Sequence, residues 1–218
     1  MLPGWAGAGT AQTAGLIVKE HREAMQRWAL QLQTAISPEA QKAAWAKRPD
    51  ITGYGRQMWV ELSDSLREEW TLEFTPWLLE TAPRFAAEEP IARMKRTPLE
   101  EIRRVTEQMH LKSPKVGRLC FSLTVFPEPP TLALVEKIEQ DNPDPLVQGQ
   151  AALALAILLK HLGDDPGVME KRLTHIRNAI IKSVNVKVGD TSVEELAMNE
   201  LYAIKHLSKG REAPNILG

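Results

Sequence analysis

The chain contains one cysteine, Cys120, so thiol chemistry is the first chemistry to consider. A nucleophilic cysteine needs a lowered pKa and a base within hydrogen-bond reach. Cys120 lies in the apolar run 116–121 (VGRLCF), and Arg118, two residues away, faces a different side of a helix. A lone thiol cannot form a disulfide within the chain, a CxxC redox pair or a thiolate zinc cluster. We therefore predict a packed core thiol.

The histidines and carboxylates offer no local reaction centre. No pair of histidines has HxxxH or HExxH spacing, so a helical metal site is not expected. Adjacent carboxylates such as Glu68-Glu69 diverge on a helix and do not form the facing pair that a glycoside hydrolase needs. We expect surface or helix-end roles for the histidines; they are His21, His110, His161, His175 and His206. The sequence predicts no catalytic residue, metal or cofactor.

One stretch of the chain, between Ile91 and Gly117, is locally basic. Two interpretations stand beside each other: a docking face for an acidic protein partner, or a solvated helix face with i, i+4 ion pairs such as Glu100–Arg104. The residues of the predicted interaction face are Arg93, Arg96, Arg103, Arg104, Lys112 and Lys115.

Composition narrows the function classes. The net charge of −1 argues against a nucleic-acid binder, which usually carries a basic excess. No apolar run approaches the ~18–20 residues of a membrane span, and 151–159 has about half that length. We therefore expect no transmembrane segment. The first eighteen residues are small and apolar but lack a basic start, so they make a poor signal peptide and leave export open.

Prolines that follow good N-cap residues divide the chain into helices. Proline is tolerated at the first helical position because its missing N–H would have no partner there. The predicted starts are Ser37-Pro38, Thr97-Pro98, Ser113-Pro114, Asp144-Pro145 and Asp165-Pro166. Thr97 and Glu100 complete a capping box, and 191–194 (TSVE) forms a second one.

Apolar periodicity agrees with helices throughout. It predicts a long amphipathic helix from near Gln12, a later helix kinked at Pro76, and a central helix over 146–159 that is apolar on nearly every face. Only 184–188 (VNVKV) alternates between apolar and polar residues, and this segment is either a strand or a loop. The predicted fold is all-α: an irregular succession of helical hairpins whose central helix, at 144–155, has HEAT-like character. No regular repeat period supports a solenoid.

The last segment carries a resemblance to a known family. The stretch 207–218 (LSKGREAPNILG) resembles the entry to the redoxin domain of bacterial thioredoxin-like thiol–disulfide oxidoreductases, some of which carry a helical extension before it. Segments 113–117 and 147–151 are similar to parts of such extensions. The resemblance implies a thiol–disulfide redox context and, for exported members, an exported protein. The paired cysteines of the family have no counterpart here, so its catalytic residues map onto no position of this sequence.

We therefore expect a helical domain over 1–208 and a linker over 209–218 that would lead into a redoxin domain. The preferred hypothesis is a non-catalytic helical module that holds, orients or recruits partners for a thioredoxin-like unit. A self-standing HEAT-like scaffold that binds a protein or peptide is the alternative, and it predicts binding that charge reversal at Arg103 and Arg104 abolishes. A third hypothesis, an enzyme with a site assembled from distant residues, predicts turnover that depends on Cys120.

Overall fold

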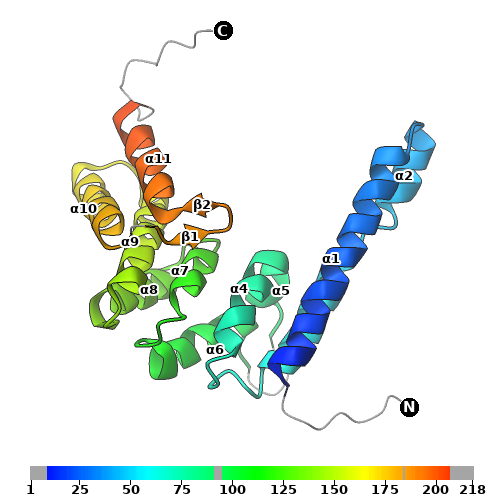
Figure 1. Ribbon diagram of the computed structural model, residues 1–218, viewed down its shortest axis with the longest axis horizontal. Coiled ribbons are helices and arrows are strands. Elements are labelled where there is room, and N and C mark those ends of the chain that lie inside the picture. The colour runs from blue at the N-terminus through cyan, green and yellow to red at the C-terminus, as the bar shows by residue number, and fades with distance from the viewer. Residues whose placement is uncertain (1–8, 91–94, 184, 207–218) are drawn as a thin grey trace. The chain divides into compact units, whose positions relative to one another are not determined.

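The computed structural model describes residues 9–90, 95–183 and 185–206, which belong to two compact units (Figure 1). The first unit comprises residues 1–102 and the second comprises residues 103–218, so the boundary between them falls inside the region expected to be one helical domain. The predicted linker, 209–218, lies outside the described residues. Among those that are described, the strands are two short ones in the second unit, and the all-α prediction is confirmed.

The first unit consists of helices that pack around α3 and α4. Its core contains the fully buried side chains of Met58, Leu62, Leu78 and Leu79. The long helix begins at Ala11, next to the predicted start at Gln12. The helices are α1 (Ala11–Thr34), α2 (Pro38–Trp45), α3 (Ile51–Leu62), α4 (Thr71–Thr81), α5 (Pro83–Glu88) and the start of α6 (Pro98–Val105).

The break in this part of the chain does not lie at Pro76, and a kink within the helix at that residue stays a prediction. Helix α4 continues through Pro76 and ends before Ala82, whose φ and ψ of −126° and 55° are not helical. The residue before a proline is pushed out of the helical region, and a proline at the first position of a new helix loses no hydrogen bond. The pair Ala82-Pro83 meets both conditions, so α5 begins there as a separate helix.

The second unit is built around one buried helix, α9. The fully buried residues of α9 include Leu153 and Leu155, which confirms the predicted central helix. Helices α7, α8, α10 and α11 all pack against it. The elements are the π-helix η1 (Thr106–His110), α7 (Gly117–Leu123), α8 (Pro129–Asp141), α9 (Pro145–Leu159), the 3-10 helix η2 (Lys160–Leu162), α10 (Pro166–Lys182), β1 (Lys187–Val188), β2 (Thr191–Ser192) and α11 (Val193–His206).

Two glycines allow the neighbours of α9 to approach it closely. A Cβ on Gly117 of α7 would lie 1.7 Å from the side-chain oxygen of Gln150, and one on Gly149 would lie 1.9 Å from the hydroxyl of Ser183. Residues Gly117 and Gln150 come from the two segments that are similar to redoxin extensions, and they meet where α7 packs on α9. A larger residue at Gly149 would meet the Cβ atoms of Ser183 and Lys182 and force α9 and the end of α10 apart, whereas at Gly117 the flexible side chain of Gln150 would have to move.

The stretch Pro145–Leu162 consists of α9 and η2. By length and composition alone it is long and apolar enough to cross a membrane. More than half of it, 56%, is buried inside the protein. The core helix of a water-soluble protein shows the same combination, so the predicted absence of a transmembrane segment stays a prediction.

Most of the predicted helix starts are confirmed. The side chains of Ser37, Asp144 and Asp165 each accept a hydrogen bond from the first turn of the helix that follows. Thr97 and Glu100 form both bonds of the capping box. Ser113-Pro114 opens a turn instead, and α7 begins three residues after Pro114.

The alternating segment ends in a small hairpin rather than a long strand. Val188 pairs with Thr191 across the two-residue turn Gly189-Asp190, and Gly189 has a φ of 64°, which favours glycine. The cap of α11 is Ser192, whose hydroxyl accepts the N–H of Glu195, while Thr191 belongs to β2. The hairpin therefore turns the chain from α10 directly into α11.

Candidate functional site

The predicted basic interaction face is partly engaged in contacts within the chain. The guanidinium of Arg103, whose side chain is only 11% exposed, donates to Glu128 at 2.8 Å and to Thr131 at 2.9 Å. Arg96, in the first unit, lies 3.6 Å from the carboxylate of Glu101. Arg103 therefore acts as an internal cross-link, whereas Arg96 is 52% exposed and makes a local ion pair.

The remaining members of that face have different surroundings. Arg104 donates to Gln108 at 2.6 Å, one turn further along the chain. Lys112 and Lys115 are exposed, and Arg93 lies outside the described residues. A docking role for these side chains stays a prediction.

Cys120 is a core residue, as predicted. Its side chain is fully buried in α7, and the thiol lies 3.6 Å from the carbonyl oxygen of Val116. Burial raises the pKa of the Cys120 thiol to about 12. A thiol with that pKa is protonated at neutral pH and is a poor nucleophile.

The histidines do not gather into a metal site. Within the described part of the chain, no three His, Cys, Asp or Glu side chains lie close enough together to hold a metal ion. His161 is exposed at the end of the central helical stretch, as predicted for a helix C-terminus. His110 is buried, which sequence reasoning did not predict.

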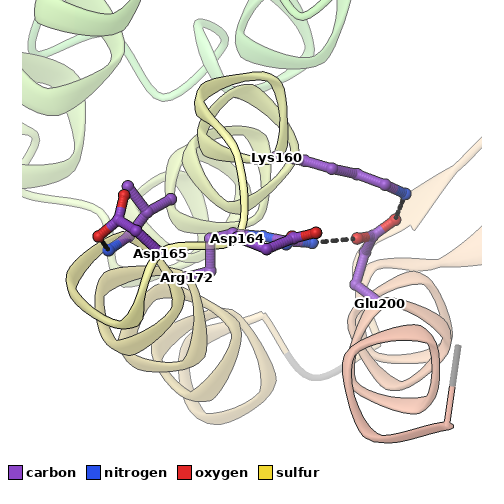
Figure 2. A network of polar contacts seen from close by, with 6 residues as sticks. Lys160, Asp164, Asp165, Arg172 and Glu200 are labelled. Atoms are coloured by element: carbon purple, nitrogen blue, oxygen red, sulfur yellow. Dashed lines mark hydrogen bonds and ion pairs between the residues drawn. The ribbon is translucent and has the colours of Figure 1, made fainter. Parts of the chain in front are cut away.

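A buried arginine joins α10 to α11 (Figure 2). Arg172 of α10 is 3% exposed, and its guanidinium lies 3.2 Å from the carboxylate of Glu200 in α11 and 3.6 Å from Asp164. Lys160, at the end of α9, reaches the other oxygen of Glu200 at 3.2 Å. The 3-10 helix η2 and the helices α10 and α11 therefore share one ionic network, which Asp164 joins from the segment between η2 and α10. Neighbouring Asp165 caps α10 beside it.

A second polar cluster joins α10 to α8. The Nδ1 atom of His175 lies 3.0 Å from the carboxylate of Glu139, which is 9% exposed, and Asn178 donates to the same carboxylate at 3.1 Å. Burial alone would raise the pKa of Glu139, but the contacts with His175 and Asn178 and the charge of Lys182 outweigh it and lower that pKa. The ionised carboxylate therefore stabilises the α8–α10 packing.

Neither polar cluster is arranged for catalysis. Glu200 and the partners of Glu139 lie on helices of the second unit and Asp164 lies just before α10, and the Arg172 and Glu139 side chains each face an opposite charge or a hydrogen-bond donor. No nucleophile with an adjacent base is present in either cluster of described residues. Their role is to fix α10 in place.

The candidate binding feature of the second unit is an apolar groove along α10 and α11, which we call the α10–α11 groove. It has a volume of about 270 Å³. Its lining is Leu173, Ile176, Arg177, Ile180, Ile181 and Leu201. Ile181 is 68% exposed, and Met198 and Tyr202, at i−3 and i+1 from Leu201 on α11, are each 51% exposed. The guanidinium of Arg177 makes no hydrogen bond or ion pair with any described residue. The groove itself is a concave surface with a mainly apolar lining, which suits an apolar side chain of a ligand or partner.

Sequence reasoning placed the candidate site elsewhere. The pattern of α10 does carry a signal, since Leu173, Arg177 and Ile181 are spaced four residues apart on one face. That spacing is also typical of a core-facing stripe, so only the packing of α10 on α9 shows which part stays uncovered.

Comparisons with known proteins identify no relative of this chain: no protein-family model, curated protein or solved structure matches it. The resemblance to redoxin-family extensions therefore remains an expectation from the sequence. The case for function depends on the site itself.

We expect Cys120 to be inert in the folded protein. Reaction with a chromogenic disulfide reagent should be slower than for an exposed thiol by about two orders of magnitude or more, because the thiol is protonated and inaccessible. Concentrated guanidinium chloride should release the full reactivity. A Thr174→Cys variant places a thiol on the exposed side of α10 and is the control. Rapid labelling of native Cys120 would contradict the buried position.

We expect Arg172→Met to destabilise the second unit strongly. It leaves the carboxylate of Glu200 without its buried partner, a loss of about 3 kcal/mol in the free energy of unfolding. Lys160→Met removes only a cation that is 52% exposed from the same carboxylate, so its cost should stay below about 1 kcal/mol. Urea unfolding followed by circular dichroism measures both. Equal losses would show that Arg172 is not the buried member of the network.

Glu139 should make the stability of the protein depend on pH under acid conditions. Its folded pKa lies below its ordinary value of 4.5, so its contribution is fully present above pH 4.5 and is lost as the pH falls through the folded pKa. Replacing it by Gln should remove this part of the pH dependence of the unfolding free energy. Glu136→Gln, at an exposed position one turn earlier in α8, should retain it. Identical pH profiles for the two variants would rule out the Glu139 cluster as the cause.

Proposed function

We propose that this chain is a non-catalytic helical module that holds or recruits a thioredoxin-like redoxin domain. The observation that supports it best is the α10–α11 groove, an apolar surface on the last two helices of the second unit. Leu201, which lines the groove, lies five residues before the end of α11, and α11 leads into residues 207–218 with their redoxin-like sequence. A domain that follows this segment would be connected to the second unit through α11, the helix that supplies Leu201.

The absence of equipment for thiol chemistry is consistent with a supporting role. The one thiol in the sequence belongs to Cys120, which is buried with a pKa raised to about 12. Thiol–disulfide exchange needs an accessible thiolate. In this proposal, the redox chemistry belongs to the recruited domain and the helical module supplies position alone.

A binding experiment tests the proposal. Purified bacterial redoxin domains, added to the 218-residue chain, should give saturable binding by isothermal titration calorimetry. Ile181→Asp places a charge in the groove and should weaken binding by about tenfold or more, since a buried unpaired charge is costly. Ile36→Asp, at a position 96% exposed in the first unit, is the matched control and should have no effect.

Two results would overturn the proposal. One is the failure of every redoxin domain to bind, combined with a reading frame past codon 218 that encodes no redoxin domain. The other is reduction of insulin or turnover of peroxide by the purified chain alone, which would make it an enzyme.

A further inference from the structure

The first unit has a groove of its own along α1 and α4, which we call the α1–α4 groove. It is open to solvent, has a volume of about 500 Å³ and is mainly apolar. Its lining is Val18, His21, Arg22, Met25, Gln26, Ala29 and Trp77. Six of these residues come from α1, and Trp77 forms the opposite wall on α4.

The spacing of the α1 residues sets the shape of what the groove can hold. Val18, Met25 and Ala29 follow one another at intervals of seven and four residues, so they form a stripe along one side of the helix. From Val18 to Ala29 the stripe is about 16 Å long, which equals about three turns of a partner helix. Although α1 is 24 residues long, Ala14 is its only fully buried residue. Such a helix has a side free to receive another helix.

The charges beside the groove indicate which charge a partner would carry. Lys19 and Arg27 each lie within 4.0 Å of Glu23, but the guanidinium of Arg22 makes no hydrogen bond or ion pair with any described residue. Arg22 lines the groove and is exposed. An unpaired guanidinium on an apolar wall is complementary to a carboxylate, which it can bind through two parallel hydrogen bonds.

Aromatic contacts hold His21 at the wall of the groove. Its ring makes edge contacts with Tyr54 and Trp77, with centroids 5.1 and 5.3 Å away. Its Nε2 atom is buried and has no hydrogen-bond partner among the described residues. Burial lowers the pKa of His21, which favours the neutral imidazole.

We infer that the α1–α4 groove binds an acidic amphipathic helix of a protein partner. The apolar side of that helix packs on Val18, Met25 and Trp77, and a carboxylate at its edge pairs with Arg22. Met25 and Trp77 suit this role, since methionine adapts to varied surfaces and tryptophan anchors many interfaces. This inference concerns the first unit and does not depend on the redoxin proposal, which concerns the second.

A displayed library of helical 18-residue peptides tests the inference. The bait is the full 218-residue chain, and peptides that also bind a Met25→Asp variant are removed. The enriched peptides should have apolar residues at i, i+3 or i+4 and i+7, with Asp or Glu at the edge of that face. A synthetic copy of the best peptide is then titrated by fluorescence anisotropy.

The variants assign the contacts. Arg22→Glu should weaken binding by about tenfold or more, and a peptide with Lys in place of its acidic residue should bind Arg22→Glu better than it binds the unchanged protein. Arg27→Glu makes the same charge change on α1 outside the groove lining and should have no effect. Ile181→Asp should also have none, which separates this site from the α10–α11 groove. Failure to enrich any peptide, enrichment of peptides without acidic residues, or equal effects of Arg22→Glu and Arg27→Glu would overturn the inference.

Discussion

The burial of α9 on all its sides is the constraint on which the second unit depends. A helix that is apolar all round cannot leave a face in water, so every neighbour must cover part of it. The six consecutive residues from Ala151 to Ala156 are all buried, and four of them are alanines, which let the covering helices approach closely. Gly117 and Gly149 extend this close approach to α7 and to the end of α10. This requirement brings α7, α8, α10 and α11 together around α9.

Apolar packing is not directional, so it does not by itself fix how a helix is oriented. The polar clusters orient the helices relative to one another. Helix α10 carries the key groups of both clusters: Arg172 reaches α11, and His175 with Asn178 reaches α8. One side of α10 is therefore buried on α9, and its two edges are tied to α8 and α11. The side that remains, with Arg177 and Ile181, is the one that lines the α10–α11 groove. The groove is what is left uncovered once α10 has met its internal contacts.

The helices were largely predictable from the sequence because their ends depend on local chemistry. Caps such as Asp144 and Asp165 hydrogen-bond within their own first turn, so the sequence around them is sufficient. The break at Ala82 was harder to predict, because Pro76 and Pro83 both disfavour a continuous helix and the local sequence does not show at which of them the helix ends. In the structure α4 contains Pro76, and Pro83 begins a new helix. The division into two units was not predicted, since it arises from contacts between residues distant in the sequence.

The same distinction explains the sites. The burial of Cys120 could be predicted from its apolar neighbours, whereas the pairing of Arg172 with Glu200 joins positions 28 residues apart and has no local signature. The two grooves were missed for the same reason, because each is lined by two helices.

The arginines of the chain differ in whether the chain itself supplies a partner for them. Arg56, Arg103 and Arg172 each pair with a carboxylate of the chain, and these pairs join separate segments. Arg22 and Arg177 have no such partner in the described residues, and each lies on the wall of an apolar groove. In water such a cation is well solvated and costs the folded chain little. A partner that covers the groove must remove that water, so it is favoured only if it supplies a negative charge in return. Under the two binding proposals, the unpaired arginine therefore selects among apolar partners by charge.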